Sequence, residues 1–384
     1  LAQWAAWVVR LPAILFLLLL GIVAGPVVGW LNPDRLFGDL LFPLVSLSVA
    51  VILFEGSMTL KFEELRGIGS TVRNLVTVGA LITWLVTSIT VYYAIDFDPK
   101  LALLFGAMVV VTGPTVITPM LRSVRPNSRI ADVLRWEGIV IDPLGALLAV
   151  LAFDFYISTE SRTALGSIGI LFAQIAIMGS VLGIVAGLVL GQLLKRYLIP
   201  DHLRSVMTLL LVFVVFTLAE AVQHEAGLLA VTVFGITLAN QKGVEIDDIL
   251  DFKESLSVLL ISGLFIILAA RVDLDALLAL GYASVVVLLS VMFLARPAAV
   301  FVSTAGSKLT FRERLLIAWI GPRGIVCAAV AAIFALRLEE MGRPEADLFV
   351  PLVFLIIIGT VIVQSASAKY IAHWLAVRDP APRG

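Results

Sequence analysis

Residues 101–124, LALLFGAMVVVTGPTVITPMLRSV, form an apolar stretch that Gly113-Pro114 interrupts in its middle. A helix needs about 20 apolar residues to cross the hydrocarbon part of a bilayer, and this stretch has that length. Proline removes a backbone N–H donor, so we expect the helix to break there and to leave carbonyl groups free. A second stretch, RERLLIAWIGPRGIVCAAVAAIF (residues 312–334), carries Gly321-Pro322 in its interior. The sequence therefore predicts two membrane helices that are each broken near their middle.

The composition places these two stretches in a polytopic membrane protein. Of the 384 residues, 60% are hydrophobic and only 14% are charged, whereas soluble domains carry about a quarter charged residues. The excess falls into apolar blocks separated by short loops. Since lipid demands internally satisfied backbones, and no ten-residue alternation typical of a barrel occurs, the blocks are predicted to be helices. The expected fold class is all-α.

Other functional classes find no support in the composition. The net charge is −1, so no basic surface is expected for nucleic acid. One cysteine and three scattered histidines give neither a disulfide framework nor a metal motif. A loop that would cradle phosphate groups and paired metal ligands are both lacking from the sequence. We therefore expect a protein that is not an enzyme and needs no cofactor.

The apolar blocks predict twelve complete spans. They are expected near residues 11–30, 39–59, 74–94, 101–121, 131–154, 165–194, 205–220, 226–240, 254–271, 277–303, 311–336 and 348–372. Residues 1–9 read as the end of a truncated first helix, which makes about thirteen transmembrane helices. The whole chain, 1–384, is expected to be one transmembrane domain without a soluble domain.

The basic residues of the loops predict the orientation. When successive loops are assigned to alternate sides, 18 Lys and Arg residues fall on one side, the side of the C-terminal tail. The six on the other side are Arg35, Lys100, Arg162, Arg271, Arg337 and Arg343. Because cytoplasmic loops are enriched in Lys and Arg, the C-terminus is expected to be cytoplasmic.

The positions of the two broken helices indicate an internal repeat. In the count of thirteen they are helices five and twelve, which correspond if helices 1–6 and 8–13 are repeats around a lone seventh. An offset of seven helices gives the repeats opposite orientation. Broken helices at matching places are typical of secondary transporters, because half-helix ends present bare N–H and C=O groups to ions at the midplane.

Asp142 lies about halfway along the span at 131–154, directly before Pro143, the third predicted helix break. Burial penalises the charged form of a carboxylate, so a proton and a cation would compete for it. The carboxylate, together with carbonyls freed by the proline, suits a partly dehydrated monovalent cation. The alternative is a structural carboxylate paired with an arginine of another helix.

Four further residues are candidates around this aspartate. Thr112 and Thr115 flank the first break and can offer hydroxyl oxygens to Na⁺ or K⁺. Glu55 and Arg323 also lie in apolar spans, and a structural ion pair between them is the simplest way to bury both.

Glu137 lies five residues before Asp142, off the face of Asp142. It could line the ion route and help to bind the cation or the proton, or it could pair with Arg135 or Arg296.

Several motifs, in order along the chain, resemble the monovalent cation/proton antiporter superfamily, in its sodium/proton exchanger-like (NhaP-type) branch. They are RLPAILFLLLLGIVAGP (10–26), ILFEGSMTL (52–60), VTGPTVITPMLR (111–122), LRWEGIVIDPLGA (134–146), GLLAVTVFGITLAN (227–240) and IGPRGIVCAAVA (320–331). The resemblance covers essentially the whole chain.

The resemblance implies a homodimer in which each protomer has dimerisation helices and a six-helix core, including about residues 74–154 and 277–372. It implies that the two broken helices cross near the ion site and that the core moves to alternate access. Asp142 is similar to the family's cation- and proton-binding aspartate, and Thr112 to a threonine that helps to coordinate the ion. Glu55 and Arg323 match an acid and an arginine that the family pairs near the site.

The chain departs from the family pattern at three places. Ile141 stands where the family commonly has Asn or Asp, Gly113 where it commonly has Asp, and Gly138 where some relatives have serine. With one carboxylate instead of two at residues 141–142, one-for-one electroneutral exchange of Na⁺ or K⁺ for H⁺ is expected. A site poor in ligands would suit K⁺, which is easier to dehydrate than Na⁺.

Two other transport functions stay open beside the antiporter. One is a gated K⁺ efflux channel, although no selectivity-filter-like loop of stacked carbonyls is evident. The other is a carrier of an organic anion bound at Arg323, for which Asp142 would be dispensable. The expected location is the bacterial plasma (inner) membrane, and a cytoplasmic regulatory domain beyond residue 384 is a possible partner.

Overall fold

The structure is a computed structural model that describes residues 13–157, 161–223, 226–244, 247–279, 281–343 and 348–378. The described part is helical, and its only extended pairing is one isolated bridge between Pro126 and Arg378. The α-helices in chain order are α2 (Ala13–Ile22), α3 (Pro33–Phe37), α4 (Leu41–Met58), α5 (Gly69–Asn74), α6 (Ala80–Ile95), α7 (Pro99–Val109), α8 (Pro114–Val124), α9 (Ser128–Ile157), α10 (Ser161–Lys195), α11 (Arg204–Val222), α12 (Ala226–Ala239), α13 (Asp247–Ala269), α14 (Leu274–Ala279), α15 (Gly281–Ser290), α16 (Arg296–Ser303), α17 (Phe311–Trp319), α18 (Ile325–Glu340) and α19 (Phe349–Trp374). The all-α expectation is confirmed for these residues.

The helices coincide with the predicted spans, because each expected span overlaps a helix or a broken pair. Within the described residues, six helices are long and apolar enough to cross a membrane, or up to eight if each bent pair counts as one span. Shorter apolar helices cover Ala13–Val27, Ala226–Ala239 and Leu256–Ala269. The polytopic membrane fold is thus supported, while the count of thirteen helices stays a prediction. The truncated helix expected at residues 1–9 lies outside the described residues.

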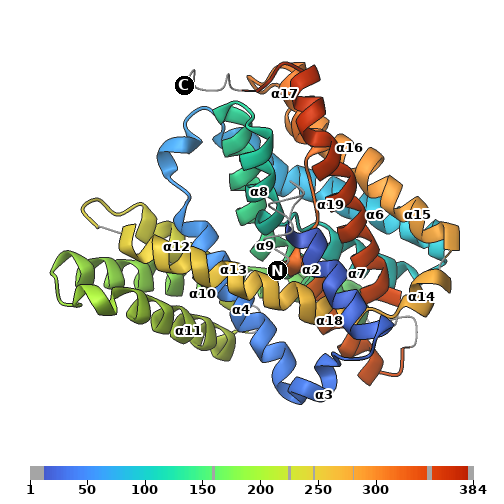
Figure 1. The fold of residues 1–384 in the computed structure, drawn as a ribbon, viewed down its shortest axis with the longest axis horizontal. Helices are drawn as coiled ribbons and strands as arrows, with labels where there is room; N and C mark the ends of the chain where they lie inside the picture. The colour runs from blue at the N-terminus through green and yellow to red at the C-terminus, as the bar shows by residue number, and fades with distance from the viewer. Residues whose placement is uncertain are drawn as a thin grey trace.

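The helices form two groups on either side of α9 (Figure 1). On one side, α12 packs against α10, α11 and α4. On the other side, α6 packs against α7 and α15, and α16 packs against α17. Helix α9 contacts members of both groups, namely α10 and α12 as well as α7 and α18. This arrangement places the middle of α9, with Asp142, inside the protein.

Two long spans contain a short π-helical turn, η4 (Leu75–Gly79) between α5 and α6 and η6 (Val291–Ala295) between α15 and α16. A π-turn inserts an extra residue into the helix, which shifts the face that the following side chains present. The two spans that contain these turns pack against each other, since α16 contacts η4 and α6 contacts η6. Arg296, which directly follows η6, thereby points into the interior, where it is 4% exposed.

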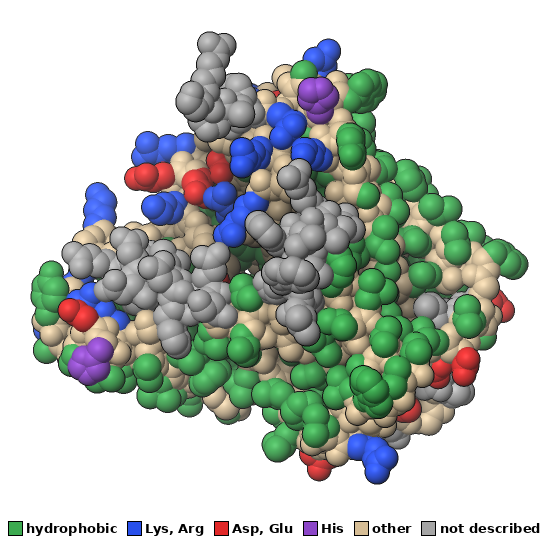
Figure 2. Space-filling view, viewed as in Figure 1, with side chains coloured by type: hydrophobic (Ala, Val, Ile, Leu, Met, Phe, Trp, Pro, Cys, Tyr) green, Lys and Arg blue, Asp and Glu red, His purple; other side chains and the backbone are tan. Residues whose placement is uncertain are grey.

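Hydrophobic side chains cover much of the lower and right-hand parts of the face seen in Figure 2. Large hydrophobic side chains on α6, α10, α11 and α15 are exposed, as illustrated by Leu85, Val185, Leu210 and Val286. In water such a surface would be unfavourable, but against lipid it needs no cover. The exposed side chains therefore agree with helices that face a bilayer.

Basic side chains gather at one end of the molecule, near α8 and α17 (Figures 1 and 2). Contacts bring three distant loops together there. The Arg378 Nε donates to the Val124 carbonyl at 2.8 Å, and the Asn127 side-chain amide donates to Glu313 at 3.0 Å. The segment after α19, the α8–α9 turn and the start of α17 thus share one end, as the orientation predicted from the basic loops requires.

Candidate functional site

The first broken helix consists of α7 and α8, which meet at an angle of 45°. Helix α7 ends at Val109, residues 111–113 are non-helical, and Pro114 begins α8. Proline suits this first position because its missing N–H has no partner there anyway and its fixed φ favours the helix. The break predicted at Gly113-Pro114 is therefore where the structure has it.

The second broken helix consists of α17 and α18, with the break predicted at Gly321-Pro322. Helix α17 ends at Trp319 and α18 begins at Ile325. Two side chains of α19 accept hydrogen bonds from the free backbone of this break: Gln364 Oε1 from the Gly321 N–H at 3.1 Å and Thr360 Oγ1 from the Arg323 N–H at 3.2 Å.

Neither α19 residue was identified from the sequence. Thr360 and Gln364 are four residues apart on one helical face of an apolar span, and this polar pair is the signal that could have identified them.

The two breaks cross in direct backbone contact. The Gly113 N–H donates to the Pro322 carbonyl at 3.0 Å. A Cβ added to Gly113 would lie 2.4 Å from the Gly324 Cα, and a Cβ added to Gly324 would lie 2.4 Å from the Gly113 Cα. Both positions therefore require glycine for close approach. Gly324 was not among the residues identified from the sequence.

Asp142 is fully buried in α9, and neither of its carboxylate oxygens has a hydrogen-bond partner among the described residues. Two contacts place it against the first break. A Cβ on Gly145 would meet the Val111 side chain at 2.3 Å, and one on Gly138 would lie 3.6 Å from the Pro114 Cα. Asp142 is four residues after Gly138 and three before Gly145, so it shares their helix face. The carboxylate therefore faces the 111–114 segment.

The threonines of that segment also have unused oxygens. The hydroxyls of Thr112 and Thr115 are buried and have no hydrogen-bond partner in the described part of the chain. Buried polar groups are ordinarily paired, so unpaired ones indicate a ligand or water. One carboxylate and two hydroxyls are hard oxygen donors of the kind that alkali cations accept. These residues fit the predicted cation site, although its occupancy by an ion stays a prediction.

Pro143 does not break its helix, contrary to the prediction. Helix α9 runs without interruption from Ser128 to Ile157. Pro143 removes only one backbone donor, and the close packing of α9 against α7, α8 and α18 holds the helix on both sides.

Glu137 is buried and forms an ion pair with Arg296 of α16. Arg296 Nη1 donates to Glu137 Oε1, and Nη2 donates to Oε2 at 2.9 Å. The same Nη2 also donates to the carbonyls of Ile317 and Ile320 at the end of α17, at 3.2 and 2.8 Å. Of the partners considered for Glu137, the structure has Arg296. Arg135 instead pairs with Glu64, at 3.3 Å.

Arg323 is 1% exposed, and its Nη1 donates to the carbonyls of Val110 and Val111 at 3.1 and 3.4 Å. The two buried arginines thus bind the carbonyl ends of the two half-helices, Arg323 at α7 and Arg296 at α17. Positive charge there compensates the negative end of the helix dipole. Glu55 is half-buried near the end of α4 and is not among the hydrogen-bond partners of Arg323. Because the Nε and Nη2 of Arg323 have no partner among the described residues, the predicted pair of Glu55 and Arg323 is not formed in the structure.

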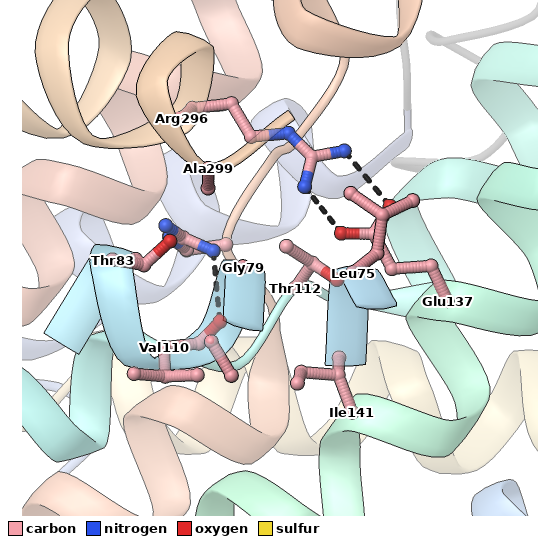
Figure 3. Close-up of a pocket in the computed structure, with 11 residues that line it drawn as sticks. Leu75, Gly79, Thr83, Val110, Thr112, Glu137, Ile141, Arg296 and Ala299 are labelled. Carbon is pink, nitrogen blue, oxygen red and sulfur yellow. Dashed lines mark hydrogen bonds and ion pairs between the residues drawn. The ribbon is translucent and has the colours of Figure 1, made fainter. Parts of the chain in front are cut away.

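A small cavity of about 10 Å³ lies at the crossing (Figure 3). Its lining includes Thr112, Glu137, Ile141, Arg296 and Arg323, together with residues of η4 and α6. Asp142 does not line it; the neighbouring Ile141 does. The cavity therefore includes Thr112 but neither Asp142 nor Thr115 of the proposed cation ligands, and it lies on the arginine side of the crossing.

The chain matches known transporters along nearly its whole length. The family model for the sodium/hydrogen exchanger transmembrane region matches residues 1–374. The "Na(+)/H(+) antiporter 1" of Methanocaldococcus jannaschii is 28% identical over 344 residues, which are 86% of this chain and 79% of that protein. The "K(+)/H(+) antiporter NhaP" of Alkalimonas amylolytica is 27% identical over 385 residues, 97% of this chain and 64% of that protein.

The fold is likewise similar to a solved structure. The sodium proton antiporter MjNhaP1 from Methanocaldococcus jannaschii at pH 8 superposes with a TM-score of 0.83 at 26% identity, covering 97% of this chain and 94% of that chain. A family match over residues 1–374 and a likeness on this scale agree with the broken, crossing helices described above. The chain belongs to the sodium/hydrogen exchanger family, in its NhaP-type branch of monovalent cation/proton antiporters.

Proposed function

We propose that the protein exchanges one monovalent cation for one proton at Asp142, by alternating access around the crossing of the two broken helices. The observation that carries this proposal is the fully buried Asp142 carboxylate, whose two oxygens have no hydrogen-bond partner among the described residues. A buried carboxylate without a partner is strongly disfavoured as a bare charge. It is stabilised either by a proton or by a bound cation, and the two exclude each other.

Thr112 and Thr115 would supply further oxygens to the cation. Their hydroxyls have no hydrogen-bond partner among the described residues, and the 111–114 segment lies against the face of α9 that carries Asp142. Glu137, which the sequence also suggested as a ligand, is engaged by Arg296 through both of its oxygens. Its role in the proposal is to hold α9 against α16, close to the ion.

The stoichiometry follows from the number of available carboxylates. Among the described residues, only Asp142 offers an unpaired carboxylate next to the Thr112 segment, since its neighbour is Ile141 and Glu137 is paired with Arg296. One carboxylate carries either one proton or one monovalent cation. The exchange is therefore electroneutral, one for one.

The two alternative functions are less well supported. An organic anion would need a site larger than the cavity of about 10 Å³ at the crossing, which has room for about one water molecule. A channel would need a continuous pore, whereas Gly113 and Gly324 are in backbone contact at the crossing. An exchanger tolerates such a closed crossing because it moves its site between the two sides.

Further features of the proposal follow from the resemblance and the charge pattern. The protein would act as a homodimer in the bacterial plasma membrane, with a cytoplasmic C-terminus and with the helices of 74–154 and 277–372 in a moving core. The shared basic end of α8, α17 and the segment after α19 supports this orientation. The choice between Na⁺ and K⁺ would depend on the small number of oxygen ligands.

The test is transport by the purified protein in liposomes that contain a trapped pH dye. Na⁺, K⁺ and Li⁺ are added in turn, with the membrane potential clamped. The wild type should move protons in response to at least one cation, and Asp142→Asn should not. Asp154→Asn is the matched control, since Asp154 is on the same helix but near its end. Transport that persists in Asp142→Asn, or that is lost equally in the control, would contradict the proposal.

A further inference from the structure

The cavity at the crossing carries one more positive than negative charge. Its charged lining residues are Arg296, Arg323 and Glu137. Glu137 and Arg296 neutralise each other through their two hydrogen bonds (Figure 3). The guanidinium of Arg323 is therefore the one formal charge of the described lining that has no opposite formal charge beside it.

Arg323 also has hydrogen-bond donors without acceptors. Its Nη1 is used by the carbonyls of Val110 and Val111, but its Nε and Nη2 have no partner among the described residues. A guanidinium stays protonated in proteins and has five N–H donors. Because the side chain is 1% exposed, bulk water does not satisfy them. Buried charged donors that lack an acceptor are strongly unfavourable.

Among the described residues, no side chain that lines the cavity, Thr83 included, accepts a hydrogen bond from the Nε or Nη2 of Arg323. Both oxygens of Glu137 are held by Arg296, and Asp142 is not part of the lining. Thr112 also lines the cavity and is 2% exposed. Its hydroxyl has no hydrogen-bond partner among the described residues and is a second donor available to an occupant. Two donors at the cavity thus lack an acceptor among the described residues, which leaves room for a bound ligand.

The size and charge of the cavity indicate the kind of acceptor. A volume of about 10 Å³ admits a single small occupant and excludes a polyatomic organic one. A net positive lining in a low-dielectric interior favours an anion over neutral water. We propose that the cavity binds one small monovalent anion of the halide class, held by Arg323 and Thr112.

The anion would serve as a fixed counter-charge during transport, a consequence that rests on the proposed function. Asp142 is neutralised by its proton in one transport state and by its cation in the other. In both states the lining of the cavity keeps its net charge of one positive, and this charge must move through the membrane together with the helices that carry it. A halide at Arg323 cancels that charge, so it is a resident ion and is not exchanged.

The predicted pair of Glu55 and Arg323 offers a different counter-charge for the same donors. Glu55 lies on α4 and does not line the cavity. If Glu55 reached Arg323, halide would not bind. The Glu55→Gln variant distinguishes the two counter-charges. If the halide occupies the cavity of the wild type, the substitution leaves halide binding unchanged. If Glu55 neutralises Arg323 in the wild type, halide binding is seen only in the variant.

The experiment measures thermal unfolding of the purified protein at constant Na⁺ and ionic strength while chloride or bromide replaces gluconate, which is too large for the cavity. The unfolding temperature of the wild type should rise with halide concentration and saturate, as expected when a ligand binds only the folded state. Bromide-soaked crystals should give one anomalous peak between Arg323 and Thr112.

Variants separate this site from other halide effects. Thr112→Val, which keeps the side-chain shape, should lower the apparent halide affinity roughly tenfold, and Arg323→Gln should abolish the saturable shift. Arg312→Gln, an exposed arginine at the start of α17, is the control and should behave as wild type. Asp142→Asn should lose transport but keep halide binding, which separates this proposal from the proposed function. Equal shifts in gluconate and chloride, or a halide shift unaffected by both Thr112→Val and Arg323→Gln, would overturn it.

Discussion

The contact between the two breaks predicts that Gly113→Ala is destabilising. The new Cβ would lie 2.4 Å from the Gly324 Cα and 2.9 Å from the Gly324 N. Carbon atoms pack best at about 3.5–4.0 Å, so the backbone segments at Gly113 and Gly324 must separate by roughly 1 Å. Overpacking of this kind costs about 1–3 kcal/mol.

Separation of these two backbone segments also weakens the hydrogen bond from the Gly113 N–H to the Pro322 carbonyl, which is 3.0 Å long in the structure. Loss of that bond adds about 1 kcal/mol. The expected total is therefore about 2–4 kcal/mol. Gly113→Asp, which restores the residue common in the family, meets the same obstacle and is expected to destabilise at least as much.

The assay is reversible unfolding of the purified protein in detergent, with transport measured in parallel. Gly169→Ala is the matched control, because a Cβ at that helical position has nothing within 4 Å and alanine favours a helix. It should leave stability unchanged or raise it.

Gly324→Ala should resemble Gly113→Ala, since it fills the same contact. The double variant should lose less free energy of unfolding than the sum of the two single variants, because the first substitution already separates the two backbone segments. If Gly113→Ala were as stable as the wild type, or if the two substitutions were simply additive, the backbone contact at the crossing would be refuted.

Three further predictions concern the contacts around the crossing. Glu137→Gln leaves Arg296 buried without a carboxylate and should lower the free energy of unfolding by about 3–5 kcal/mol, whereas Arg135→Gln, which removes a partly exposed pair, should cost below about 1 kcal/mol. Denaturant unfolding of both variants checks this, and similar losses would contradict it. Thr310→Ala removes the capping box at the start of α17 and should cost about 1 kcal/mol, seen as faster hydrogen exchange in the first turn of that helix; unchanged exchange would exclude a stabilising cap. Gln364→Leu leaves a backbone N–H of the second break without its acceptor and should cost about 1–3 kcal/mol in thermal unfolding, with Gln364→Glu, which keeps an acceptor oxygen, expected to lose less.

The positions of the breaks could be predicted because they depend on local chemistry. Gly113-Pro114 and Gly321-Pro322 interrupt apolar stretches, and proline acts on its own backbone and on the preceding turn. The burial of Asp142 could be predicted in the same way from its apolar flanks. Pro143 shows the limit of this reasoning, because α9 continues through it when neighbouring helices pack on both sides.

The partners at the site could not be predicted, because they lie far apart in the sequence. Glu137 had two plausible partners, and the one in the structure, Arg296, is 159 residues away. Thr360 and Gln364, which bind the backbone of the second break, belong to a helix whose sequence is mostly apolar. Without the packing of α19 against α17 and α18, nothing relates these residues to the break.

The sequence by itself determined that this chain is a helical membrane protein with two broken spans and a buried aspartate, since hydropathy, span length and proline act over one helix. Only the tertiary structure decided that the breaks cross at Gly113 and Gly324, that two arginines bind the half-helix carbonyls, and that Ile141 rather than Asp142 lines the cavity. These features depend on which helix faces meet and at what rotation. That choice is made by the packing of all the helices together, so it cannot be read from any one of them.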